Sequence, residues 1–261
     1  MPDALFSLKN TTSIVTGANG YLGREMAYAL AESGSKVFLQ GRDELKLEQL
    51  SSEMKSKGFI VEKALFDVRD ESQIKEFFRK LSSPLNILIN NAYSGSAGSI
   101  ESSSKENFQD SFEISVISAF MMTKYALPCF RLVGSNETKS IINIASMYGM
   151  VSPDLSIYDS KNVCNPPFYG AAKAGLIQFS KYSAEDLSVY GIRVNSISPG
   201  PFPSVEAQEN VTLMSKIQSK TILKRLGSAE EIKGPIIFLA SKASSYVTGT
   251  NLIVDGGWTA K

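Results

Sequence analysis

Two side chains four residues apart, Tyr169 and Lys173, are the pair in this sequence best suited to acid/base chemistry. They open a segment in which Ala172, Leu176 and Phe179 recur at helical spacing, so a helix would present the phenol and the ammonium on one face. A free phenol has a pKa near 10, and a neighbouring cation lowers it by favouring the phenolate. Tyr169 and Lys173 could therefore move a proton at neutral pH. Taken alone, however, a Tyr and a Lys at this spacing are more often two surface residues.

The composition narrows the chemistry further. The sequence contains no histidine, which excludes Ser-His-Asp hydrolysis and histidine-based zinc catalysis. Cys129 and Cys164 have neither a CxxC nor a zinc-type spacing, so we expect no metal site and no disulfide framework. The 27 Lys and Arg residues nearly balance 26 Asp and Glu residues, which argues against a nucleic-acid or membrane-surface partner. Without a secretory pattern or a run of ~20 apolar residues, we expect a cytoplasmic protein.

A glycine-rich segment, TGANGYLG at residues 16–23, lies between a β-branched run and an amphipathic segment. Glycine lets the backbone approach a pyrophosphate closely, and the free N–H groups at a helix start favour its negative charge. This strand-turn-helix placement predicts a dinucleotide phosphate site, the alternative being a tight turn without a ligand. The residues expected at the phosphates are Gly17, Asn19, Gly20, Tyr21 and Leu22.

The end of the second β-branched run bears on the choice between NAD(H) and NADP(H). An acidic side chain there binds the adenosine ribose hydroxyls, whereas a nearby arginine accommodates a 2′-phosphate. Gly41 occupies the position where the acid is expected and Arg42 follows it, so the sequence favours NADP(H), with NAD(H) as the other choice. In the alternative interpretation, Arg42 caps a loop and Asp43 starts the next helix.

Short β-branched runs alternate with longer amphipathic segments along the chain, which is typical of a parallel sheet covered by helices. The 261 residues, 43% of them hydrophobic, suit one large core and therefore a single domain. The predicted strands are 12–16, 36–40, 59–66, 86–90, 140–145, 193–198 and 251–254. The predicted helices are a first one around Leu22 to Leu30, capped by Gly34, and then 43–57, 71–81, 105–132, 169–190 and 229–241. This order predicts a doubly wound Rossmann fold in the α/β class, with a seven-stranded parallel sheet and helices on both faces.

A series of short motifs extends over essentially the whole chain: TGANGYLG, Asp67-Val68, Asn90-Asn91-Ala92, Ser146, YGAAK at 169–173, NSISPG at 195–200 and Asp255-Gly256-Gly257. In this order and spacing the chain resembles the compact branch of the short-chain dehydrogenase/reductases. The resemblance implies that Tyr169 gives or takes the proton, that Lys173 lowers its pKa and binds the nicotinamide ribose, and that Ser146 holds the substrate oxygen. It also implies a homodimer or homotetramer formed through the long central helices.

The same resemblance extends the predicted cofactor site beyond the phosphate loop. Asp67 and Val68 would contact the adenine, and Pro199 and Gly200 would shape the nicotinamide end, where Ser204 stands at a position that often carries a threonine. The full set expected at the cofactor is Gly17, Asn19, Gly20, Tyr21, Leu22, Arg42, Asp67, Val68, Asn91, Ala92, Tyr93, Tyr169, Lys173, Pro199, Gly200, Phe202 and Ser204.

Three residues depart from the family pattern. Tyr21 replaces the usual central glycine of the phosphate loop, and Tyr93 stands where the NNAG motif ends in glycine, so that a bulky ring would narrow the pocket. Ser115 aligns with a helix position that often carries a catalytic Asn, which relays protons towards the lysine. We include Ser115 among the catalytic candidates. Because serine donates only one proton, either a water fills the gap or the relay runs elsewhere.

Two segments are expected to contact the substrate: a substrate loop at about 201–222, and an insertion at about 152–167 that is longer than the family usually has. Loops at the carboxyl ends of parallel strands build the sites of such folds, so the insertion is expected to form a polar wall over a hydroxylated substrate. Its alternative is a solvated surface loop. The polar residues of the insertion are Asp154, Tyr158, Asp159, Lys161, Asn162 and Asn165. The stretch Tyr148 to Tyr158 also resembles short-chain dehydrogenases linked to bacterial flagellin or surface-sugar modification.

The sequence therefore predicts an NAD(P)(H)-dependent enzyme that transfers a hydride between the nicotinamide and a carbonyl or secondary alcohol of a small, polar, sugar-like substrate. One alternative is a reductase of apolar ketones or ketoacyl groups, which would need an apolar pocket. The other is a catalytically quiet nucleotide-binding protein that acts as a sensor or assembly partner. Ser146, Tyr169 and Lys173 argue against the last alternative, whereas Ser115 in place of Asn favours it.

Overall fold

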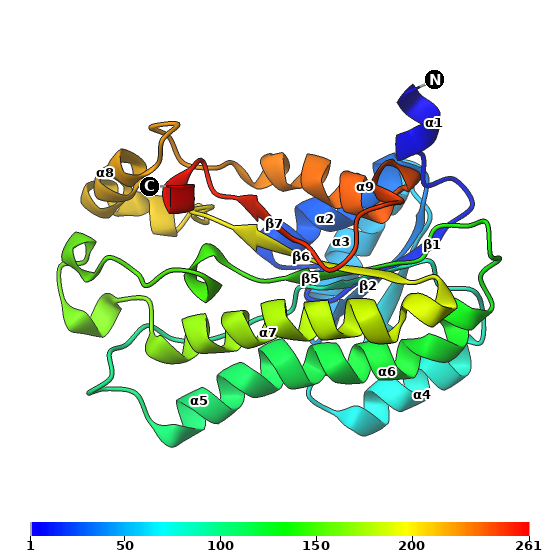
Figure 1. Cartoon of the computed structure of the whole chain (residues 1–261), viewed down its shortest axis with the longest axis horizontal. Coiled ribbons are helices and arrows are strands. Elements are labelled where there is room, and N and C mark those ends of the chain that lie inside the picture. The colour runs from blue at the N-terminus through cyan, green and yellow to red at the C-terminus, as the bar shows by residue number, and fades with distance from the viewer. Residues whose placement is uncertain (1, 261) are drawn as a thin grey trace.

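The computed structural model describes residues 2–260 and contains a parallel sheet between two layers of helices (Figure 1). The strands are β1 (Thr12–Val15), β2 (Lys36–Gly41), β3 (Val61–Leu65), β4 (Ile87–Asn90), β5 (Ser140–Ile144), β6 (Arg193–Pro199) and β7 (Asn251–Val254). Their order in the sheet is β3-β2-β1-β4-β5-β6-β7, and every neighbouring pair is parallel. The order reverses between β1 and β4, which makes the sheet doubly wound and places the ligand crevice of such folds beside β1.

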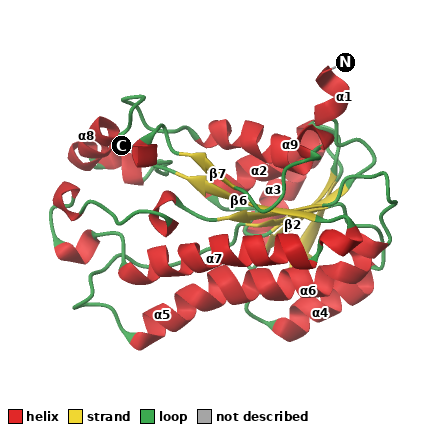
Figure 2. Ribbon diagram, in the orientation of Figure 1, coloured by secondary structure: helices red, strands yellow, loops and turns green. Residues whose placement is uncertain are grey.

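The helices form the two outer layers, as the ribbon in Figure 2 shows. One face of the sheet carries α2, α3 and α9, and the other carries α4, α5, α6 and α7 (Figure 1). The helix bounds are α1 (Pro2–Phe6), α2 (Tyr21–Glu32), α3 (Glu44–Ser56), α4 (Glu71–Leu81), α5 (Lys105–Phe112), α6 (Ser118–Arg131), α7 (Pro167–Asp186), α8 (Val211–Lys220) and α9 (Lys233–Ala240). Among residues 2–260, no helix is both long and apolar enough to cross a membrane.

The core lies on both faces of the central strands. Val15 and Ile89 pack with α2, α3 and α9, whereas Ile14 and Leu88 pack with α4, α6 and α7. These side chains are fully buried, because successive residues of a strand point to opposite faces of a sheet that is covered on both sides. The carboxyl ends of the strands are thereby held rigidly at one edge.

All seven predicted strands are confirmed, with ends within two residues of the expected bounds, and Gly34 follows α2 with a φ of +100°. The predicted continuous helix 105–132 is wrong in one respect, because a π-helical segment, Glu113–Ile117, separates α5 from α6. Branched side chains crowd this turn, and the Ser118 hydroxyl donates to the Ile114 carbonyl at 2.6 Å, competing with the backbone ladder. Residues 201–222, expected as a loop, contain α8.

Candidate active site

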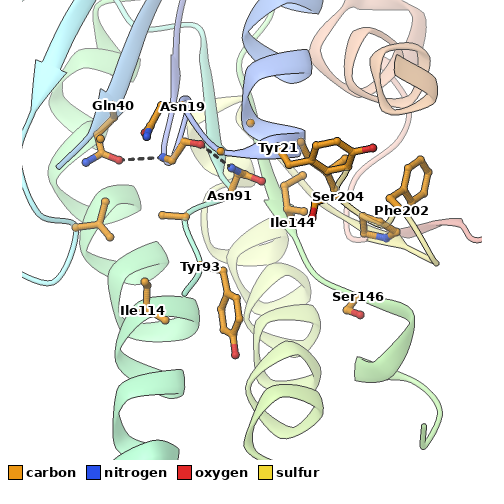
Figure 3. Close-up of a pocket in the computed structure, with 18 of the residues that line it drawn as sticks. Asn19, Tyr21, Gln40, Asn91, Tyr93, Ile114, Ile144, Ser146, Phe202 and Ser204 are labelled. Carbon is orange, nitrogen blue, oxygen red and sulfur yellow. Dashed lines mark hydrogen bonds between the residues drawn. The ribbon is translucent and has the colours of Figure 1, made fainter. Parts of the chain in front are cut away.

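A cavity of 790 Å³ opens at the carboxyl ends of the strands, within the size range of cofactor sites. Its lining follows β1, β2, β4, β5 and β6, so segments far apart in the sequence meet there (Figure 3). Most of the expected site residues line it: Gly17, Asn19, Gly20, Tyr21, Leu22, Arg42, Val68, Asn91, Ala92, Tyr93, Ser146, Tyr169, Lys173, Pro199, Gly200, Phe202 and Ser204.

The glycine-rich loop needs its glycines for close backbone approach. Gly17 has a φ of +64°, and a Cβ there would lie 3.0 Å from the Ala92 Cα. A Cβ at Gly23 would lie 2.1 Å from the Gly17 carbonyl oxygen, so a side chain at either position would displace the turn. The turn leads into the start of α2, where the first N–H groups of a helix are free for an anion.

Hydrogen bonds fix this loop to the neighbouring strands. The Gly17 N–H donates to Gln40 Oε1 at 3.1 Å, and Gln40 Nε2 donates to the Phe66 carbonyl at 2.6 Å. On the other side, Asn91 Nδ2 donates to the Thr16 carbonyl at 2.9 Å, and the Thr16 hydroxyl accepts from the Asn91 N–H at 2.8 Å. Figure 3 shows Gln40 and Asn91 on opposite sides of the loop. The amide side chains of Gln40 and Asn91 therefore hold the glycine-rich loop between β2 and β4.

The end of the cavity beyond β2 carries two cations, Arg42 and Lys46. Asp43, which also lines it, accepts from the Lys46 N–H at 3.1 Å as the N-cap of α3, and its carboxylate lies 3.7 Å from Lys46 Nζ. Asp67 lies outside the cavity. Its carboxylate accepts from Arg69 at 2.9 Å and from Arg42 at 3.4 Å, and Arg69 holds its pKa at about 2. Three cations, Arg42, Lys46 and Arg69, therefore share two carboxylates at this end, which leaves a net positive charge.

Ser146, Tyr169 and Lys173 line the opposite end of the cavity. Lys173 is 3% exposed and donates from Nζ to the Ile144 carbonyl at 2.7 Å, and burial lowers its pKa to about 8. Burial raises the pKa of the Tyr169 phenol, with a smaller opposing effect from the Ser146 hydroxyl. Lys173 donates to a carbonyl, and its Nζ lies 5.7 Å from the Tyr169 ring centroid. The lowering of the phenol pKa by Lys173 stays a prediction.

Ser115 does not line the cavity, although its neighbour Ile114 does. It lies in the π-helical segment packed against α7, and its buried hydroxyl has no hydrogen-bond partner among the described residues. Serine is shorter than the Asn expected at this position and has a single O–H donor, so its hydroxyl reaches no hydrogen-bonding group among the described residues.

No residue of the insertion at 152–167 lines the cavity, and its role as a polar wall over the substrate stays a prediction. Asp154 lies 2.7 Å from Lys220, and Asp159 lies 3.0 Å from Lys216, so both carboxylates face α8. Ile157 is buried against Met147 and Trp258, with Leu213 and Ile217 of α8 packed on the same cluster. Charge pairing and apolar burial therefore hold the insertion on α8.

Several lining residues were not singled out from the sequence: Gly23, Gln40, Lys46, Ile114, Ile144 and Ala145. Lys46 had a usable signal, because it lies in the first turn of the helix that follows Arg42. Gln40 had another, as a polar residue within an apolar strand.

Comparisons with known proteins agree with this geometry. A family model described as enoyl-(acyl carrier protein) reductase matches residues 17–259. The chain belongs to the short-chain dehydrogenase/reductase family. It is 31% identical to a tropinone reductase homolog of Arabidopsis thaliana, over 97% of this chain and 91% of that protein. It is also 31% identical to a 3-oxoacyl-[acyl-carrier-protein] reductase of Buchnera aphidicola, over 96% and 98%.

Among solved structures, this member of the short-chain dehydrogenase/reductases is similar to a gluconate 5-dehydrogenase from Burkholderia cenocepacia in complex with NADP and tartrate. The TM-score is 0.88 at 25% identity, and the match covers 100% of both chains. The protein is therefore an oxidoreductase of this family with a doubly wound fold.

Proposed function

We propose that this protein transfers a hydride between NADP(H) and a carbonyl or secondary alcohol carbon of a small molecule. One observation carries the proposal: a single cavity has Ser146, Tyr169 and Lys173 at one end and the cations Arg42 and Lys46 at the other, with the glycine-rich loop between them. This arrangement suits an extended dinucleotide whose pyrophosphate lies at the start of α2.

The bound nicotinamide would supply or accept the hydride, and the chain's own residues would manage the proton. In carbonyl reduction, the Ser146 hydroxyl donates to the substrate oxygen while the Tyr169 phenol transfers its proton to that oxygen. Burial keeps the phenol protonated in the free enzyme, because it raises the Tyr169 pKa. Lys173, with a pKa of about 8, is mostly charged at neutral pH and can stabilise the phenolate that forms. The free enzyme therefore has a protonated Tyr169 and a charged Lys173, the forms that carbonyl reduction requires.

The cations Arg42 and Lys46 support a preference for NADP(H). A 2′-phosphate placed between them gains charge-assisted hydrogen bonds, whereas a free ribose hydroxyl finds no unpaired carboxylate among the lining residues. Asp43 is engaged as the cap of α3. The NADP in the Burkholderia cenocepacia structure supports the same choice of cofactor.

For the substrate, we favour a neutral carbonyl compound with an apolar part. Tyr93, Ile114 and Phe202 line the nicotinamide end, and Lys173 is the cation recorded there. Because no residue of the insertion lines the cavity, the insertion gives no support for a sugar. A polyhydroxylated substrate is the second candidate, which the similarity to the gluconate 5-dehydrogenase favours. The similarity to a 3-oxoacyl reductase favours the first.

The test follows nicotinamide absorbance with purified protein, NADPH or NADH, and three matched sets of compounds. These are neutral aliphatic and cyclic ketones, 3-oxoacyl thioesters, and keto derivatives of sugars and sugar acids, with the corresponding alcohols run in reverse with NADP⁺. Higher kcat/KM on the ketones or thioesters with NADPH supports the first candidate, and higher values on the sugar derivatives support the second. Tight NADPH binding without turnover of any compound would instead support the quiet nucleotide-binding alternative.

A further inference from the structure

Tyr93 touches both residues of the acid/base pair. Its ring packs edge to face on the Tyr169 ring, with centroids 4.9 Å apart and an interplanar angle of 69°. Lys173 Nζ lies 5.2 Å from the Tyr93 ring centroid, nearer than it lies to the Tyr169 ring. At such a distance an ammonium is attracted by the quadrupole of an aromatic ring. Tyr93, which stands where the family has a glycine, therefore contacts both Tyr169 and Lys173.

The far end of Tyr93 is held by its own surroundings. The phenol oxygen lies against Gly95, where a Cβ would come within 2.3 Å of it, so a side chain at position 95 would displace the Tyr93 hydroxyl. The Tyr93 hydroxyl also interacts with Ser111, and the Ser111 hydroxyl in turn donates to the Phe168 carbonyl at 3.2 Å. In Figure 3 the hydroxyl points away from the glycine-rich loop, between Ile114 and Ser146. The ring is thus anchored to the residue that precedes Tyr169.

Tyr93 does not compete with Tyr169 as a proton donor. Burial raises the pKa of Tyr93 to about 12, so its phenol stays neutral and presents an uncharged ring to the ammonium. Its hydroxyl is directed to Ser111 and Gly95, whereas the Tyr169 phenol interacts with Ser146. The two tyrosines therefore have separate roles.

Within residues 2–260, no carboxylate pairs with Lys173, and burial lowers the Lys173 pKa. The charged groups on the elements packed against α7 have partners other than Lys173. Tyr148, on the turn after Ser146, has a pKa raised by burial, and the carboxylates of Asp110 and Glu113 act on Arg69. Arg193 of β6 donates to carbonyls around the end of α9. The buried Lys173 ammonium contacts the Ile144 carbonyl and the rings of Tyr93 and Tyr169.

We propose that Tyr93 is a positioning residue of the acid/base pair: its ring face holds the Lys173 ammonium, and its contact with the Tyr169 ring keeps the phenol beside Ser146. The inference rests on the proposed function, because it assigns Tyr93 to the same reaction. Tyr93 stands where the family has a glycine. Its aromatic ring replaces part of the hydration that the Lys173 ammonium loses on burial.

The test compares Tyr93→Phe, which keeps the ring, with Tyr93→Leu, which keeps an apolar side chain without a quadrupole. The Cε–Hε resonance of isotope-labelled lysine, assigned by its loss in Lys173→Arg, is titrated by NMR without any substrate. Removing the ring removes a stabilisation of the charged form, so the pKa of Lys173 should fall by about half a unit to one unit in Tyr93→Leu and stay near the wild-type value in Tyr93→Phe. Equal Lys173 pKa values in the two variants would overturn the inference.

Turnover gives a second readout. Carbonyl reduction needs the charged lysine, so activity is lost as the pH rises through the Lys173 pKa, and this limb of the kcat profile should move to lower pH in Tyr93→Leu by the same amount. NADPH affinity and cooperative thermal unfolding check that the variants fold, and Tyr93→Met replaces Tyr93→Leu if that variant does not unfold cooperatively. If wild type turns over no substrate, the proposed function fails, while the NMR titration still decides whether Tyr93 holds the ammonium.

Discussion

The two ends of the active-site region are built in different ways. At the cofactor end, short loops leave the strands directly, and hydrogen bonds from Gln40 and Asn91 hold them. At the other end of this region, ion pairs and apolar contacts join the insertion to α8: two exposed ion pairs and the cluster around Ile157. Substitution of side chains at the ends of the strands should therefore change kcat and cofactor affinity strongly. Substitution of side chains on the insertion should change the KM for the substrate weakly and indirectly.

The largest effect is expected for Tyr169→Phe. The variant keeps the ring and loses the proton, so kcat should fall by at least about 100-fold while NADPH affinity stays near the wild-type value. The matched control is Tyr158→Phe on the insertion, which should leave kcat unchanged. Near-normal turnover by Tyr169→Phe on a verified substrate would remove Tyr169 as the acid/base.

A smaller effect is expected for Arg42→Ala. Loss of a charge-assisted contact at a partly exposed site should weaken NADPH binding by about tenfold and leave NADH binding unchanged. Lys46→Ala should act in the same direction with a smaller change, because Lys46 is more exposed. Fluorescence titrations of both cofactors measure this, with Lys55→Ala on the outer surface of α3 as control. Equal losses for NADPH and NADH would contradict a 2′-phosphate site.

The insertion should act through α8. Replacing Asp154 and Asp159 together by Ala should raise KM by about two- to fivefold at constant kcat and constant NADPH affinity, since exposed ion pairs contribute little. The variant that exchanges the charges of one pair, Asp154→Lys with Lys220→Asp, should have a KM near the wild-type value if this ion pair acts by fixing the insertion to α8. Glu101→Ala breaks a comparable exposed pair with Lys161 and serves as control. No recovery by the charge exchange would favour direct contact of these carboxylates with the substrate.

The smallest effect is expected for Ser115→Ala. The buried hydroxyl has no partner in the described chain, so its removal should change kcat by less than about threefold and leave the thermal midpoint no lower than that of wild type. A loss of tenfold or more, roughly the worth of one hydrogen bond to a charged group, would place Ser115 in a proton relay.

The same contrast explains what the sequence could predict. The strands, the glycine-rich loop and the positions of Ser146, Tyr169 and Lys173 depend on local pattern and fixed spacing, and the structure brings them together as expected. The helix α8 was missed because its valine, threonine and serine residues favour helix weakly, and its Leu213 and Ile217 pack on the distant Ile157. The partners of Asp154 and Asp159 likewise lie some sixty positions away, beyond any periodicity in the chain.

The role of Tyr93 also follows from tertiary contacts. The sequence indicated a bulky ring near the nicotinamide, but its contacts with Lys173 and Tyr169 depend on how α7 lies against the loop after β4. The homo-oligomeric state and the cellular compartment stay predictions.

The buried Gln40 side chain has a consequence for the kinetics of cofactor capture. Both ends of its amide are bonded, one to the Gly17 N–H and the other to the Phe66 carbonyl, so the protein's own hydrogen bonds order the glycine-rich loop. The conformational entropy of that loop is lost when the chain folds and does not have to be lost again on binding. Association should then approach the rate of diffusional encounter, and the Gly17 amide should exchange slowly with deuterium even without cofactor.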